Sequence, residues 1–133
     1  MRKFLRLVYY WLPPVIWMSI IFYLSSRLHA QVTGKFLFDF LIFKSLHMIE
    51  YAILYFLLLR AFYSISKSYL TINHKFLYPL LISILYAASD EIHQTFVPTR
   101  EGKIRDVFID TAGIIMMYIY IKHNISAVKK FLN

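Results

Sequence analysis

The sequence predicts an all-α membrane protein in which four transmembrane helices form one bundle. Of the 133 residues, 59% are hydrophobic and 19% are aromatic, and the mean hydropathy is +0.56. A soluble domain of this size cannot bury that much apolar surface, because a small domain keeps a large surface for its volume. The apolar residues form continuous runs rather than an alternating pattern, which disfavours a β-barrel. We therefore treat residues 1–133 as a single transmembrane domain.

The first two spans are expected in the N-terminal half of the chain. The first lies at residues 7–24, where Pro13 and Pro14 either start the helix proper or kink it. The segment 36–43 is apolar but too short to cross a bilayer, so we expect a short interfacial or re-entrant segment there. The second span follows at residues 44–63.

The third and fourth spans are expected at residues 76–96 and 106–122. Pro79 stands in the first turn of the third span, where a missing N–H costs little. Because a span needs about 20 residues, the second, third and fourth segments reach full length only with their polar ends included. Those polar ends must therefore lie at an edge of the bilayer or face other helices.

Basic residues are concentrated on one side of this predicted bundle. With four spans, the two termini and the loop 64–75 lie on the same side and carry eight basic residues and no acid. All seven acids fall on the other side or in the helix ends that meet it. The positive-inside rule then places both termini in the cytoplasm. The eight basic residues are Arg2, Lys3, Arg6, Lys67, Lys75, Lys122, Lys129 and Lys130.

The net charge of +8 fits membrane lipid as a partner rather than nucleic acid, because basic residues that flank apolar spans meet anionic headgroups. The chain has no cysteine, which excludes disulfides, thiolate metal ligands and a cysteine nucleophile. The expected location is the cytoplasmic membrane, crossed several times.

Polar residues gather at the helix ends that this topology places on the outer face. At three of these ends the residues have helical spacing, so each end presents one polar stripe. We expect the stripes to converge on a common centre, with Gly113 letting the fourth helix approach a neighbour closely. Ionisable clusters beside a membrane core usually mark function. The stripes are Lys44, His47 and Tyr51; Asp90, His93 and Gln94; and Asp106, Asp110 and Gly113, with Glu91 and Arg100 beside them.

The residue types of this cluster suit acid–base chemistry or the binding of a polar ligand. The candidate catalytic residues are His93, Asp90 and Asp106, acting as general acid and base. Lys44 and Arg100 have the charge to hold an anionic group such as phosphate. The candidate ligand-binding residues are Lys44, His47, Tyr51, Glu91, Gln94, Arg100 and Asp110.

Other interpretations of the same residues stay open. Histidine and aspartate side chains such as His47 and Asp90 also suit a zinc or other divalent site, but no tight ligand motif is present, so the metal is undetermined. Ser89 and Ser26 are available as nucleophiles, but no strained turn motif surrounds either, so a nucleophilic triad has little support. The cluster is also compatible with a polar network that only holds helices together.

Three motifs in this cluster resemble the VanZ-like family, which comprises small polytopic membrane proteins of bacteria. The family is named for a member linked to resistance to the glycopeptide antibiotic teicoplanin. The resemblance covers residues 11–120, with Thr99 where the family commonly has Gly and Asp110 where it often has Asn. The motifs are Lys44-x-x-His47-x-x-x-Tyr51, Ser89-Asp90-Glu91-x-His93-Gln94-x-Phe96-x-Pro98-x-Arg100 and Asp106-x-x-x-Asp110-x-x-Gly113.

The resemblance implies a bacterial cell-envelope protein that contributes to low-level resistance to teicoplanin-type antibiotics, or handles an envelope lipid, through an outward-facing polar site. Teicoplanin carries a fatty acyl chain and a polar peptide core, which suits a polar site at the outer edge of the bilayer. Two alternatives remain. One is a membrane-embedded hydrolase or transferase that acts on a phosphate-bearing lipid headgroup, using His93 with Asp90 or Asp106. The other is a structural helper subunit without a ligand. The sequence identifies no cofactor.

Overall fold

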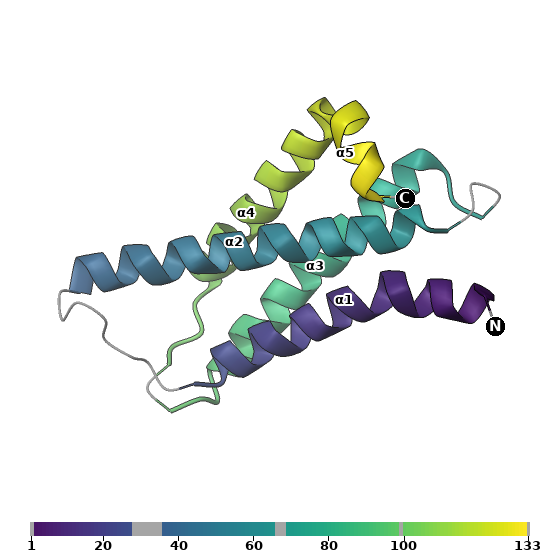
Figure 1. Ribbon diagram of the computed structural model, residues 1–133. Coiled ribbons are helices and arrows are strands. Elements are labelled where there is room, and N and C mark those ends of the chain that lie inside the picture. The colour runs from purple at the N-terminus through teal and green to yellow at the C-terminus, as the bar shows by residue number, and fades with distance from the viewer. Residues whose placement is uncertain (1, 28–35, 66–68, 99, 133) are drawn as a thin grey trace.

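The described part of the chain is entirely helical outside its connections, which confirms the all-α class. The structure is a computed structural model that describes residues 2–27, 36–65, 69–98 and 100–132. Lys67 and Thr99, which entered the charge pattern and the family motif, lie outside the described residues. The helices are α1 (Arg2–Ser25), α2 (Phe36–Tyr63), α3 (Ile72–Gln94), α4 (Ile104–His123) and α5 (Ile125–Leu132), arranged as in Figure 1.

Helix α1 extends further toward the N-terminus than the expected span at 7–24. Pro13 and Pro14 lie inside it rather than at its start. Each proline removes one N–H from the helix ladder and pushes against the preceding turn, which is the usual cause of a kink. Figure 1 shows α1 bending in its middle, in agreement with the kinked alternative.

Helix α2 corrects one prediction. The segment 36–43 is not a separate interfacial or re-entrant piece, because α2 runs without a break from Phe36 to Tyr63. This range contains no glycine or proline, so nothing in the backbone interrupts the ladder of hydrogen bonds. With 28 residues the helix is about 42 Å long, which exceeds the hydrocarbon thickness of a bilayer. A helix of this length cannot lie wholly within the apolar layer if it crosses the bilayer along the normal.

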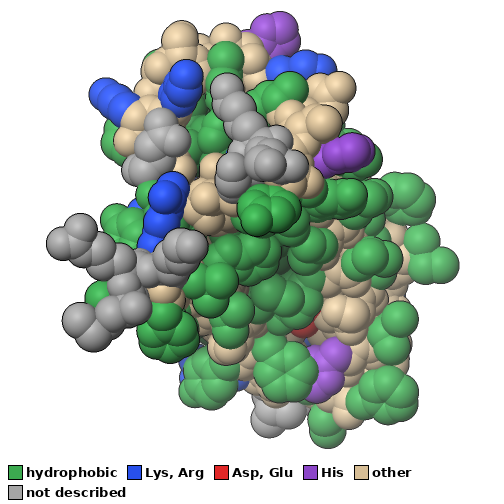
Figure 2. Space-filling view, turned by 90° about the vertical axis from the view of Figure 1, so that its right-hand side faces the viewer, with side chains coloured by type: hydrophobic (Ala, Val, Ile, Leu, Met, Phe, Trp, Pro, Cys, Tyr) green, Lys and Arg blue, Asp and Glu red, His purple; other side chains and the backbone are tan. Residues whose placement is uncertain are grey.

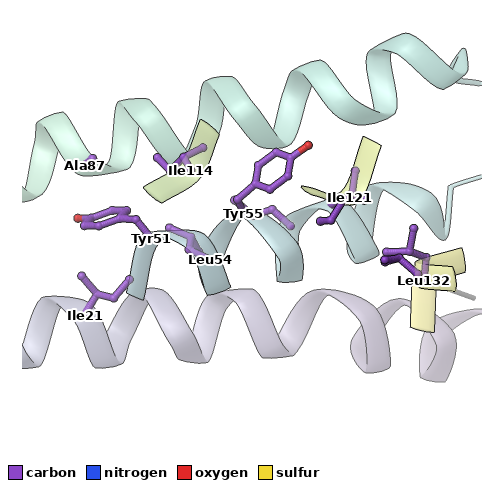
Figure 3. Close-up of a cluster of buried hydrophobic side chains, with 11 residues drawn as sticks. Ile21, Tyr51, Leu54, Tyr55, Ala87, Ile114, Ile121 and Leu132 are labelled. Atoms are coloured by element: carbon purple, nitrogen blue, oxygen red, sulfur yellow. The ribbon is translucent and has the colours of Figure 1, made fainter. Parts of the chain in front are cut away.

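Helix α2 is also the centre of the fold, since it packs against each of the other four helices. Apolar side chains lie on all sides of this helix. Its C-terminal half is largely buried by neighbours, whereas its N-terminal half exposes residues such as Leu41 and Ile49. Tyr51, Leu54 and Tyr55 are fully buried and point between the surrounding helices (Figure 3). Side chains of the other helices complete this core: Ile21 of α1, Ala87 of α3, Ile114 and Ile121 of α4, and Leu132 of α5.

The sequence analysis did not identify α5. Val128 and Leu132 are buried against the end of the bundle, while Lys129 and Lys130 are exposed. The apolar residues follow the spacing of one helical face, and α5 contacts α2 and α4. The chain therefore turns back on the bundle after α4 and does not trail away as a basic tail.

Two helices are long and apolar enough to cross a membrane. These candidate spans are Phe4–Ser25 in α1 and Leu37–Tyr63 in α2. In the described residues, α3 and α4 do not meet the same measure of length and hydropathy. The protein is thus a membrane protein with at least two candidate spans, and the four-span arrangement remains a prediction.

Candidate functional site

The polar residues of interest lie where four helices come together. The end of α1, the first half of α2, the end of α3 and the start of α4 meet toward the left of Figure 1. These are the helix ends that the sequence analysis assigned to one face. The contacts within this region fall into separate groups, which we describe in turn.

The first group joins α1 to α3 through Asp90. Ser25 Oγ donates to Asp90 Oδ2 at 2.7 Å, and Gln94 Nε2, one helical turn further along, donates to the same oxygen at 3.0 Å. All three side chains are buried. A buried carboxylate needs such donors, because an unpaired charge away from water is costly. These hydrogen bonds position the end of α1 against the end of α3.

The second contact between the same helices involves Ser26 and His93. Ser26 Oγ lies 3.0 Å from His93 Nε2, and it also donates to the carbonyl of Phe22 at 2.7 Å. The Phe22 ring stacks on the imidazole with 4.4 Å between ring centres and 29° between planes. The imidazole is therefore held on one face by an aromatic ring and at one nitrogen by a hydroxyl.

The third group joins α2 to α4. Lys44 Nζ lies 2.6 Å from Asp106 Oδ2, and Arg105 Nε lies 3.4 Å from Asp106 Oδ1. The Arg105 guanidinium lies 4.9 Å from the centre of the Phe40 ring. Lys44, which was considered as a holder of an anionic ligand, thus pairs with an acid of the protein itself.

The loop between α3 and α4 is tied back to both neighbours. Arg100 donates to the carbonyls of Leu24 at 3.2 Å and Arg27 at 3.0 Å, at the C-terminal end of α1, where helix carbonyls lack partners. Glu91 Oε2 accepts the backbone N–H of Lys103 at 3.0 Å. The position of the Glu91 carboxylate therefore serves to anchor the start of α4.

Gly102 and Glu101 complete this loop. A side chain at Gly102 would collide with the backbone carbonyl of Glu91, so the loop needs glycine there. Glu101 and Lys103 form an exposed ion pair at 2.5 Å. The hydrogen bond and charge of Lys103 lower the pKa of the Glu101 carboxyl below its ordinary value.

His47 and Glu50 lie between these groups on α2. His47 Nδ1 is 3.7 Å from Glu50 Oε2, and the Glu50 carbonyl accepts the indole N–H of Trp17 at 2.9 Å. Both side chains are half-buried. The 3.7 Å separation is longer than a hydrogen bond, so both side chains can still bind a further partner.

Tyr51 and Asp110 lie deeper, in the interior of the bundle. Both are fully buried, and Tyr51 is within electrostatic reach of Asp90 and Asp110. Asp110 Oδ2 has no hydrogen-bond partner among the described residues, although Glu91, Asp90, Asp106 and Lys44 all act on this carboxyl. A buried carboxylate oxygen without a partner is commonly satisfied by an ordered water. Asp110 does not line either of the two cavities described below.

Two cavities adjoin at this end of the molecule, with Phe43, His47 and Arg100 lining both. The larger, of about 610 Å³, lies beside the end of α1, and Ser26, Arg27 and Glu50 contribute to its wall. The smaller, of about 560 Å³, is lined mainly by charged and polar side chains, with Phe40 and Phe43 beside them. Its charged lining comprises four basic residues, Lys44, Arg100, Lys103 and Arg105, and two acidic ones, Glu101 and Asp106.

The candidate residues therefore separate into two sets. Lys44, His47, Gln94, Arg100 and Asp106 line the smaller cavity. Members of all three stripes, namely Lys44, Asp90 and Asp106, lie within electrostatic range of Asp110. In the described part of the chain, however, no direct hydrogen bond or ion pair joins any two of His47, Asp90, His93 and Asp106. The remaining candidates do not line either of these two cavities: they are Tyr51, Asp90, Glu91, His93 and Asp110.

The described residues contain no group of three or more histidine, aspartate or glutamate side chains placed to hold a metal ion. Sequence reasoning considered Ser26 only as an available nucleophile and did not include Ser25, Glu50 or Arg105 among the candidate site residues, although all four contact or line the site. The signal for the two serines was their position directly after the first apolar run, level with Asp90 and His93.

Comparison with known proteins gives a family and no individual relative. No curated protein and no solved structure matches the chain. The family model described as VanZ/LLP1 matches residues 5–126, which is nearly the whole chain and includes all the cavity-lining residues above. The chain therefore belongs to the VanZ/LLP1 family.

Proposed function

We propose that this protein holds the anionic headgroup of an amphiphile at the outer face of the bacterial cytoplasmic membrane. The amphiphile is an envelope lipid or a teicoplanin-type lipoglycopeptide, and its capture contributes to low-level resistance. The observation that carries this proposal is the smaller cavity, whose four basic residues outnumber its two acidic ones. Clustered cationic donors of this kind favour phosphate and carboxylate groups.

A four-span arrangement belongs to the same proposal. Helix α3, with 23 residues, and α4, with 20, are about 35 and 30 Å long, which matches a hydrocarbon layer of about 30 Å. Both also expose large apolar side chains that lipid would cover. They include Leu77, Leu81 and Leu85 on α3 and Phe108, Ile115 and Ile119 on α4.

The distribution of charge supports a cytoplasmic location for both termini. The two ends of the chain lie toward the same side of the molecule in Figure 1. Figure 2 faces that side and shows Lys and Arg side chains, with acidic side chains barely visible. The cavities lie toward the opposite end, so the positive-inside rule orients them outward.

Cysteine labelling tests this orientation on a clean background, since the chain has no cysteine. A cysteine replacing Glu101, whose side chain is 76% exposed in the α3–α4 loop, should react with an impermeant thiol reagent in intact cells. A cysteine replacing Ser126, exposed on α5, should react only after the cells are opened. The reverse pattern would turn the cavities toward the cytoplasm and overturn the outward site.

Binding of a short-chain anionic lipid tests the function itself. Lys103→Gln combined with Arg105→Gln removes two exposed cationic groups from the cavity and spares the buried Lys44–Asp106 pair. At roughly 1 kcal/mol for each lost charge, the affinity for dihexanoyl phosphatidylglycerol should fall on the order of tenfold or more. Dihexanoyl phosphatidylcholine should bind weakly to both proteins. Isothermal titration calorimetry in detergent measures these affinities.

The matched control removes two charges from the other end of the molecule. Lys129→Gln combined with Lys130→Gln alters exposed residues of α5 and should leave the affinity unchanged. Equal losses in the two double variants would show a general charge effect and contradict a headgroup site. In cells, the cavity variant alone should restore teicoplanin sensitivity at equal protein level.

A further inference from the structure

The contact between Ser26 and His93 has a chemical capacity that headgroup binding does not use. The hydroxyl oxygen lies 3.0 Å from Nε2 of the imidazole, which is the reach expected between a nucleophile and its base. Ser26 lines the 610 Å³ cavity, so its hydroxyl is accessible to a molecule that enters there. His93 stands directly behind it and does not line that cavity.

The surroundings hold the imidazole in place. The stacked Phe22 ring restricts its plane, and the charge of Asp90 acts on it from one helical turn away on α3. The Ser26 hydroxyl now donates to the Phe22 carbonyl at 2.7 Å. Rotation of the hydroxyl hydrogen about the Cβ–Oγ bond redirects it from that carbonyl to Nε2, with the oxygen unmoved. The pair can therefore adopt the arrangement in which histidine accepts the serine proton.

The composition of the two adjoining cavities indicates which bond would lie at Ser26. The larger cavity carries apolar side chains, Leu24, Phe43 and Leu46, beside the hydroxyl. The smaller cavity next to it carries the cationic residues. In a phospholipid the acyl ester lies between the phosphate and the hydrocarbon chain. A headgroup in the cationic cavity and an acyl chain along the apolar wall would thus bring an ester carbonyl toward Ser26.

We propose that Ser26 and His93 form a nucleophile–base pair that cleaves an acyl ester of an anionic membrane lipid, which rests on the function proposed above. The Ser26 oxygen bonds to the ester carbonyl carbon as His93 Nε2 takes the hydroxyl proton. The bond from that carbon to the lipid alkoxy oxygen breaks, and His93 returns the proton to this oxygen. Water then attacks the acyl carbon while His93 takes one of its protons. The bond from this carbon to Ser26 Oγ breaks, His93 returns the proton to the serine oxygen, and a fatty acid leaves. Water is the only co-reactant.

Arg100 is placed to stabilise the negative charge that develops on the carbonyl oxygen. It lines the same cavity as Ser26 and is held by the carbonyls of Leu24 and Arg27 on either side of that residue. These two bonds use two of the five N–H donors of a guanidinium. A donor fixed in advance beside the developing charge is the main requirement of an oxyanion site.

Labelling with a fluorophosphonate tests the nucleophile without knowledge of the lipid. The serine oxygen displaces fluoride from phosphorus, and mass spectrometry of the purified full chain locates the adduct. We expect the adduct on Ser26, its loss in Ser26→Ala, and at least a hundredfold slower labelling in His93→Gln. The matched control is Ser19→Ala, because Ser19 donates to the carbonyl four residues earlier, as Ser26 does, and is exposed on α1, which ends directly before Ser26. It should label like the wild type.

Lipid turnover separates this inference from the proposed function. Release of fatty acid from phosphatidylglycerol in nanodiscs should occur with wild type and Ser19→Ala and stop with Ser26→Ala. Wild type and Ser19→Ala should both bind dihexanoyl phosphatidylglycerol, which shows that the headgroup site is intact in the proteins that are compared. A folded wild type that binds this lipid but forms no Ser26 adduct and releases no fatty acid overturns the nucleophile and leaves the binding function standing. Absence of binding overturns the proposed function.

Discussion

Gly113→Ala is expected to destabilise the protein by roughly 1–3 kcal/mol, because an added methyl group has no room between α2 and α4. A Cβ atom at this position would lie 2.9 Å from the carbonyl carbon of Met48 and closer still to its oxygen. Alanine is the better helix former by about 1 kcal/mol, which acts in the opposite direction. The clash prevails because it meets backbone of the neighbouring helix, which cannot rotate away as a side chain can.

Unfolding of the purified protein in detergent, followed by heat or denaturant, measures this effect. Gly113→Leu should be worse than Gly113→Ala and should reduce the yield of folded protein. The adjacent Ala112→Leu is the control, since Ala112 is exposed on α4 and has space for a larger side chain. If Gly113→Ala were as stable as the wild type, the close approach of α2 and α4 would be wrong.

Lys44→Ala is expected to cost about 3 kcal/mol of stability, toward the lower end of the range for breaking a buried ion pair. The side chain of Asp106 is 7% exposed and that of Lys44 is 20% exposed. Without Lys44, in the described part of the chain Asp106 keeps the longer 3.4 Å contact with Arg105. The penalty arises from a carboxylate that stays buried and poorly paired.

The double variant Lys44→Met with Asp106→Leu distinguishes the cost of an unpaired charge from the value of the pair. Replacing both charged side chains by apolar side chains of similar size should restore most of the stability that Lys44→Ala loses. Lys103→Ala, which breaks only the exposed pair with Glu101, should change stability by less than about 1 kcal/mol. Equal losses in Lys44→Ala and in the double variant would show that these side chains matter through packing.

Local sequence patterns predicted much of the helix content. Long apolar runs indicated the helices, and the absence of alternation disfavoured strands. The role of Gly113 followed from its spacing with Asp106 and Asp110 on one helical face, and the structure places it against Met48. The polar stripe that contains Lys44 was also recognised from helical spacing, and the structure places Lys44 against Asp106 of another stripe.

Two errors of the sequence analysis have local causes. The segment 36–43 was separated from the second span because it was judged by span length, although nothing in it stops a helix and α2 includes it. Helix α5 was overlooked although Ile125, Val128 and Leu132 follow helical spacing. Both signals were present, so these are errors of interpretation rather than limits of the sequence.

By itself, then, the sequence determined the helical class, the polar helix ends and the inventory of charged and hydroxyl groups available there. Which of these groups meet was decided by tertiary structure. Ser25 contacts Asp90 and Ser26 contacts His93 across more than sixty intervening residues. Such contacts depend on the rotation of each helix about its axis and on its sliding along its neighbour. Because successive residues of a helix are about 100° apart around its axis, a small rotation of the helix decides which side chain lines a cavity and which does not. Packing around α2 sets that rotation.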